Sequence, residues 1–187
     1  MKHRLFIALK IHESVKDEII NRRESLCDEK SLKWKWENRS KIHATIKFLG
    51  DVEKNKVNGI ISLLDFLEEE ISYSCQLTNY GIFYRNKIPA ILWQGFEIEQ
   101  RINELVKKVN DKLFLIDIER EVKSFKPHLT LLRLRGNEDD KSLEKFKSAS
   151  FPRFDFIISE ASLYESRLTP RGSIYKEIKN YQFKKKD

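Results

Sequence analysis

The segment Ile-His-Ala-Thr-Ile at residues 42–46 has a near copy at residues 127–131, Pro-His-Leu-Thr-Leu. Both contain a histidine, one spacer, a threonine and an aliphatic residue, although the chain of 187 residues has only four histidines. Each copy lies in an apolar run that predicts a strand, and a glycine turn signal follows it, Gly50 in the first case and Gly136 in the second. Because one local pattern recurs in both halves of the chain, we expect two similar lobes that pack directly on each other.

The spacing within each copy has a chemical consequence. Residues two apart in a strand point to the same face, so each segment presents an imidazole beside a hydroxyl. Two imidazoles that face each other across a cleft can act as general acid and general base in phosphate chemistry. Thr45 and Thr130 can then donate hydrogen bonds to phosphate oxygens. A single strand histidine is more often a packed or surface residue, and threonine is a good strand former, but the repetition favours a site at His43 and His128.

Two cations follow the motifs. Arg133 lies on the face opposite Thr130 in a regular strand, so a role in the site requires a twist, a bulge or a strand end. Lys47 lies on the same predicted face as His43, where it adds positive potential or is an ordinary surface lysine. Aromatic residues offer surfaces for base stacking, or alternatively core and rim positions. They are Trp34, Trp36, Phe83, Tyr84 and Trp93.

Other catalytic arrangements lack support in the sequence. A metal site needs a third ligand at a suitable spacing, but His3 and His12 are far apart and neither Cys27 nor Cys75 adjoins a histidine. The chain contains no Gly-x-Ser-x-Gly nucleophile motif, and its six glycines form no phosphate-binding loop. We therefore expect no metal and no cofactor. The reaction type that remains is acid–base catalysis by side chains on a substrate that is already activated.

The composition indicates a folded, basic protein. The net charge is +7 and the isoelectric point is about 9.3, which is typical of proteins with a polyanionic partner such as nucleic acid and equally of a generic basic surface. Two separate cysteines form no disulfide framework, and the apolar run at residues 5–9 is too short for a signal peptide or a membrane span. We expect a cytoplasmic monomer, not bound to membranes, with one domain or two lobes that share a core.

Hydrophobic periodicity predicts alternating strands and helices. The expected strands are residues 5–9, 32–36, 42–49, 72–84, 88–93, 128–134, 154–164 and 174–181. The expected helices are residues 13–28, 52–70, 97–113 and 139–148. The lysines at 184–186 predict a disordered tail.

With both motifs in place, the chain resembles the 2H phosphoesterase superfamily, and within it the RNA 2′,3′-cyclic phosphodiesterases, historically called 2′-5′ RNA ligases. The resemblance extends over residues 4–9, 43–51, 91–95, 125–133 and 163–175. Ala44 departs from the larger aliphatic residue that is usual there, but as a spacer it points away from the predicted site.

The resemblance implies an α+β fold and a single bilobal catalytic domain over residues 1–187. Two antiparallel sheets would be related by an approximate two-fold around a central groove, with helices outside. It implies hydrolysis of RNA 2′,3′-cyclic phosphate ends to 2′-phosphomonoesters, together with reversible 2′-5′ ligation. By the same resemblance His43 is the acid for the 3′ oxygen and His128 is the base for water. Thr45, Thr130 and Arg133 would bind the phosphate.

Two other functions stay open at this point. One is a non-catalytic module that binds RNA ends or 2′-5′-linked nucleotides, and the other is a related enzyme for small cyclic nucleotides such as an ADP-ribose cyclic phosphate. Retention of both histidines and both threonines favours catalysis, because binding alone does not require two acid–base groups.

Overall fold

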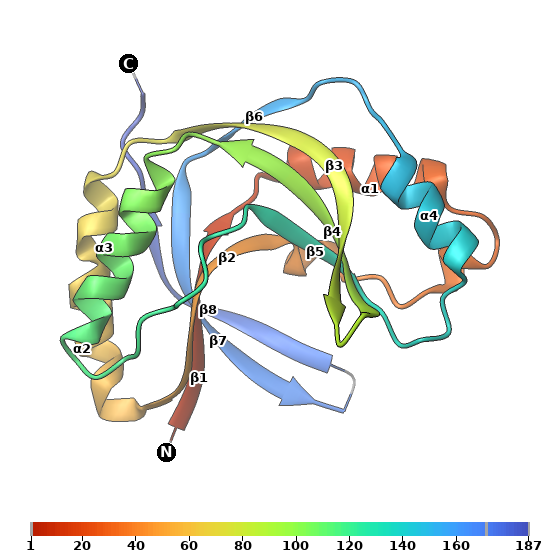
Figure 1. The fold of residues 1–187 in the computed structure, drawn as a ribbon. Coiled ribbons are helices and arrows are strands. Elements are labelled where there is room, and N and C mark those ends of the chain that lie inside the picture. Colours follow the sequence, from red (N-terminus) through yellow and green to blue (C-terminus); the bar gives the residue numbers. More distant parts are fainter. Residues whose placement is uncertain (1, 171, 187) are drawn as a thin grey trace.

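The computed structural model of the protein describes residues 2–170 and 172–186 and contains two four-stranded antiparallel sheets (Figure 1). The helices are α1 (Glu13–Leu26), α2 (Val57–Leu64), α3 (Ile102–Phe114) and α4 (Asp140–Ser148). The strands are β1 (Lys2–Lys10), β2 (His43–Glu53), β3 (Tyr73–Arg85), β4 (Ile88–Ile98), β5 (His128–Arg133), β6 (Asp155–Ile158), β7 (Glu160–Thr169) and β8 (Gly172–Gln182). Short 3-10 turns occur at η1 (Ser31–Lys33), η2 (Arg39–Lys41), η3 (Lys54–Lys56) and η4 (Asp65–Glu69).

The two sheets repeat one plan. The first has the strand order β2-β1-β7-β8 and the second has β5-β4-β3-β6. The run β1–α1–β2–α2 therefore corresponds to the run β4–α3–β5–α4. The histidine motifs begin β2 and β5, which are edge strands of their own sheets and lie against each other. The expected α+β fold with two related antiparallel sheets is confirmed.

The helices form two pairs on the outside of the sheets. α2 and α3 lie side by side at one end of the molecule, and α1 lies beside α4 at the other (Figure 1). The ammonium of Lys145 in α4 donates to the carbonyl of Leu26 at the end of α1 at 2.7 Å. Helix α3 forms because apolar residues recur every three or four positions, and Leu105, Val109 and Leu113 are all buried.

Strand β1 shows how the core and the groove share one sheet. Leu5, Ile7 and Leu9 belong to a hydrophobic cluster that contains residues of both lobes. Phe6 points to the opposite face, where its ring centroid lies 5.1 Å from that of His43. The alternation of a strand thus separates the core face from the face that bears the first motif.

Residues 32–36 were predicted as a strand, and this is wrong. The side chain of Asp28 accepts hydrogen bonds from the backbone of Lys30 and Ser31, which turns the chain into η1. Only Trp36 makes a strand-like bridge, to Leu132.

Other bounds differ from the prediction as well. Strand β4 continues to Ile98, where a helix was predicted from residue 97, and the predicted helix 52–70 contains only α2 as an α-helix, after the end of β2 and between two 3-10 turns. Strand β2 continues through Gly50, which adopts φ +71° at an irregularity of the ladder, to Glu53. The predicted strand 154–164 is two strands in different sheets, and the carbonyl of Ser159 between them accepts the N–H of Phe183. The predicted disordered tail is paired instead, because the N–H of Lys184 donates to the carbonyl of Glu70.

Candidate active site

Both histidine motifs contain a β-bulge at the same position. Strand pairing skips Ile46, the residue after Thr45, where β2 pairs with β1. It likewise skips Leu131, the residue after Thr130, where β5 pairs with β4. A bulge inserts one residue into a strand, so the side chains that follow it lie on the faces opposite to those that simple alternation predicts, until another bulge occurs.

This exchange decides which cation reaches the groove. Arg133 lies on the groove side together with Thr130, because the bulge at Leu131 exchanges the faces of the residues after it. This is the irregularity that a role of Arg133 in the site required. Phe48 occupies the corresponding place after His43 and is 63% exposed. Lys47 is only 2% exposed, so the interpretation as an ordinary surface lysine is wrong, although Lys47 is among the residues that line the cavity.

The buried ammonium of Lys47 is bound on the helix side of β2. It donates to Oδ1 of Asn110 in α3 at 2.7 Å and to the carbonyl of Glu119 at 2.6 Å. Asn110 Oδ1 also accepts the N–H of Glu121 at 2.8 Å. Lys47 and Asn110 therefore attach the segment after α3 to the strand of the first motif.

A cavity of about 790 Å³ contains all five predicted site residues. It is lined by His43, Thr45, His128, Thr130 and Arg133, together with Glu37, Lys41, Phe48, Phe83, Tyr84, Lys126 and Tyr175 among others. The two strands that begin with the histidines thus bring both imidazoles and both hydroxyls to one groove.

His43 is surrounded by aromatic rings. The ring of Tyr175 meets it edge-on with centroids 5.4 Å apart, and Phe6 packs at 5.1 Å. Burial lowers the pKa of His43 from 6.5 to about 4, and the carbonyl of Lys41 opposes this shift while the charge of Arg133 adds to it. The free protein therefore holds His43 neutral at pH 7.

His128 has a fixed ring orientation. Its Nδ1 lies 2.6 Å from the carbonyl of Lys126, and because a carbonyl only accepts, Nδ1 carries the proton in the neutral ring. Phe83 packs edge-on with centroids 4.9 Å apart. Burial lowers the pKa of His128, and the charges of Lys126 and Arg133 lower it further. Nε2 is then the nitrogen free to accept a proton.

The groove attracts anions. Arg133 lies 3.3 Å from the carboxylate of Glu37 and interacts with Tyr175, whose pKa is raised by burial and by Glu37. Lys41 and Lys126 also line the cavity. None of Glu37, Tyr175, Lys41 and Lys126 was predicted from the sequence. The two lysines could have been found, because each stands two residues before a motif histidine.

The aromatic residues divide between the two interpretations. Phe83 and Tyr84 line the groove, and Trp93 packs on Phe83 with centroids 5.1 Å apart. Trp34 and Trp36 pack against α4 instead and are partly buried next to the core.

Within residues 2–170 and 172–186, no group of three or more His, Cys, Asp or Glu side chains is arranged to hold a metal ion. Both cysteines, Cys27 and Cys75, are free thiols. Among the described helices, none combines the length and the apolar character that a membrane span requires.

The fold and the paired motifs agree with a family comparison. The sequence model of the family LigT like Phosphoesterase matches residues 9–93 and 96–175, so the chain belongs to this family of 2H phosphoesterases. The expected membership of a phosphodiesterase family is confirmed.

Individual relatives cover nearly the whole chain. An RNA 2′,3′-cyclic phosphodiesterase of Methanocaldococcus jannaschii is 31% identical over 95% of this chain and 99% of its own length. One of Thermotoga maritima is 29% identical over 96% of this chain and 95% of its own. Among solved structures, E. coli LigT complexed with 3′-AMP has a TM-score of 0.74 at 20% identity and covers 98% of this chain and 99% of its own. This last likeness concerns the fold.

Proposed function

We propose that the protein hydrolyses 2′,3′-cyclic phosphate ends of RNA to 2′-phosphomonoesters, with His43 and His128 as the acid–base pair. The observation that carries the proposal is the meeting of two bulged His-x-Thr strands at one cation-lined groove. The names of the M. jannaschii and T. maritima relatives support the same reaction.

The reaction needs one proton acceptor and one proton donor. Water attacks the phosphorus opposite the 3′ oxygen, a new P–O bond forms and the bond to the 3′ oxygen breaks. His128 takes the proton of the water through Nε2, because its Nδ1–H is bound to the Lys126 carbonyl. His43 gives a proton to the departing 3′ oxygen. The hydroxyls of Thr45 and Thr130 and the guanidinium of Arg133 stabilise the charge on the non-bridging oxygens.

The acid role requires His43 to gain a proton when substrate binds. Its pKa of about 4 in the free protein follows from burial and from nearby positive charge. A phosphate anion placed between His43 and Arg133 offsets that charge and raises the pKa of the imidazole. Binding of the substrate thus favours protonation of His43, which the acid role requires.

We propose that the same groove also catalyses 2′-5′ ligation, by the same displacement with a different nucleophile. A 5′-hydroxyl in place of water attacks the cyclic phosphate, the 3′ oxygen leaves with a proton, and a 2′-5′ linkage forms. Since each lobe supplies one imidazole and one hydroxyl, we propose that residues 1–187 act as one bilobal catalytic domain. All of the groups in this proposed mechanism come from one chain, so the mechanism requires no partner subunit.

The test uses a 5′-labelled RNA that ends in a 2′,3′-cyclic phosphate, incubated with EDTA, with the 2′- and 3′-phosphate products resolved. We expect the 2′-phosphate, and a bell-shaped dependence of kcat/KM on pH. His43→Ala and His128→Ala each lower turnover by roughly two to four orders of magnitude. Circular dichroism of both variants controls for folding.

Near-normal turnover in a folded variant would remove that residue from the mechanism. Tight binding of the RNA end without turnover would instead indicate a binding module. Turnover of small cyclic nucleotides alone would indicate the other phosphoesterase activity.

A further inference from the structure

A second cavity adjoins the groove on the other side of His43. It has a volume of about 630 Å³ and shares Lys41, His43 and Tyr175 with the groove. Its remaining wall comes from β1, η2, α1, β7 and β8. This volume is in the range of small-molecule sites, roughly 300–1,000 Å³. A substrate whose reacting phosphate lies at His43 can therefore extend into it.

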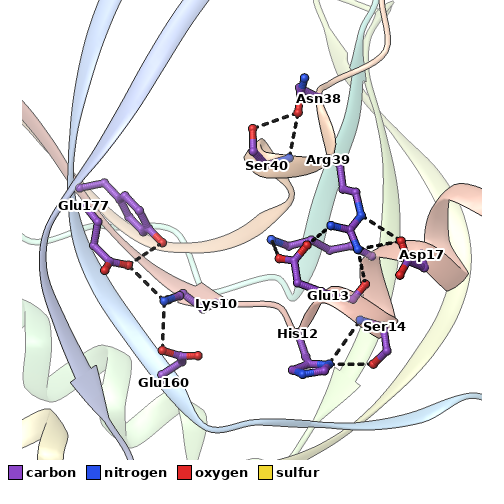
Figure 2. Close-up of polar contacts among 12 residues, drawn as sticks. Lys10, His12, Glu13, Ser14, Asp17, Asn38, Arg39, Ser40, Glu160 and Glu177 are labelled. Carbon is purple, nitrogen blue, oxygen red and sulfur yellow. Dashed lines mark hydrogen bonds and ion pairs between the residues drawn. The ribbon is translucent and has the colours of Figure 1, made fainter.

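Ion pairs hold the walls of this cavity in place (Figure 2). Arg39, in η2, donates to Asp17 at 2.9 Å and pairs with Glu13, so α1 fixes the turn that leads into β2. Lys10 on β1 lies 3.1 Å from Glu160 and 3.2 Å from Glu177. The turn places Lys41 at the boundary between the two cavities.

Lys41 differs from Lys10, Lys16 and Arg133, which lie close to it around the two cavities. Lys10 and Lys16 are each within 3.2 Å of a carboxylate, and Arg133 is paired with Glu37. Among residues 2–170 and 172–186, the ammonium of Lys41 forms no ion pair with a carboxylate, and it lies 6.0 Å from the centre of the Tyr175 ring. The charge of the Lys41 ammonium is therefore available to bind an anionic ligand.

The internal repeat supports a role for this position. Lys41 stands two residues before His43, as Lys126 stands two residues before His128. The ammonium of Lys126 also lies over aromatic rings, 4.6 Å from Trp93 and 5.1 Å from Phe83. The related lobes therefore place one lysine over an aromatic ring on each side of the reacting phosphate.

From these observations we infer that Lys41 binds the phosphodiester that joins the last two nucleotides of the RNA. This inference rests on the proposed function. Beyond Lys41 the cavity has the carboxylates of Glu13 and Glu160 and the hydroxyl of Ser40. Carboxylates repel a phosphate but accept hydrogen bonds, so this end takes the ribose and base of the penultimate nucleotide. The protein then prefers an oligonucleotide to a mononucleotide.

The test compares kcat/KM for a nucleoside 2′,3′-cyclic phosphate and for a dinucleotide with the same end. We expect the wild type to prefer the dinucleotide, and Lys41→Gln to reduce this preference about tenfold, because a charge-assisted contact is lost. Lys33→Gln removes the same charge from an exposed residue outside both cavities and leaves the preference unchanged. Equal losses on both substrates, or a wild type without preference, would overturn the inference.

A binding measurement separates this inference from the proposed reaction. If neither substrate is hydrolysed, the proposed function fails, and calorimetry with the 2′-phosphorylated mononucleotide and dinucleotide still tests Lys41. For the dinucleotide, Lys41→Gln lowers the slope of log affinity against log salt by about 0.7, as expected for one lost contact to single-stranded nucleic acid. An unchanged slope would refute the phosphate contact.

Discussion

Replacing His43 by asparagine should weaken the dependence of stability on pH between pH 7 and pH 5. The folded protein holds the pKa of His43 at about 4, chiefly through burial, whereas an unfolded chain has the ordinary value near 6.5. On unfolding the imidazole therefore takes up a proton in this range. Proton uptake by the unfolded state lowers stability as the pH falls.

The magnitude follows from the two pKa values. With 6.5 in the unfolded chain and about 4 in the folded protein, linkage predicts a loss of about 2 kcal/mol at pH 5 relative to neutral pH. Most of this loss should be absent in His43→Asn. The variant also loses contact with Phe6 and Tyr175, so its stability at pH 7 falls too, and only the difference between the two pH values is diagnostic.

Urea unfolding followed by circular dichroism at pH 7 and pH 5 measures this difference. His12→Asn is the matched control, because His12 is exposed, caps α1 by accepting from the N–H of Ser14, and asparagine can cap in the same way. The control should keep the wild-type dependence. If His43→Asn keeps it as well, the depressed pKa of His43 and the substrate-dependent acid are both refuted.

The remaining predictions concern the support of the groove. Asn110→Ala removes an acceptor from the buried ammonium of Lys47 and should lower the free energy of unfolding by about 3 kcal/mol, whereas the exposed Asn103→Ala on the same helix should change it little. Equal effects in urea unfolding would contradict the role of this pair. Gly81→Ala places a Cβ inside the contact distance of the Trp93 ring, so we expect a loss of about 1–3 kcal/mol in the free energy of unfolding and a displaced indole. Unchanged tryptophan fluorescence and stability would show that the ring has room.

Much of the candidate site was predictable because it is encoded locally. The alternation of apolar residues predicts the strands, and the recurrence of His-x-Thr identifies His43 and His128 without knowledge of the fold. The same alternation predicts that Thr45 and Thr130 accompany them, since two residues along a strand return to the same face. The family resemblance adds the pairing of the two lobes.

The faces of Arg133 and Lys47 were not predictable from alternation. Each stands after a bulge, and the position of a bulge depends on how β2 pairs with β1 and how β5 pairs with β4. Alternation along the strand shows that Arg133 reaches the groove only if the strand has a bulge, but it does not show whether the bulge exists. For Lys47 the bulge places the ammonium against Asn110 and the carbonyl of Glu119, where the side chain is buried.

Spacing over a few residues was enough to predict the two candidate histidines, most of the strands and the likeness of the two halves. The tertiary structure alone decided that β6 and β7 belong to different sheets and that Lys41 stands between two cavities. The walls of those cavities come from segments distant in the chain, such as β1, η2 and β8. Contacts of that kind depend on the register of whole strands, which no local pattern specifies.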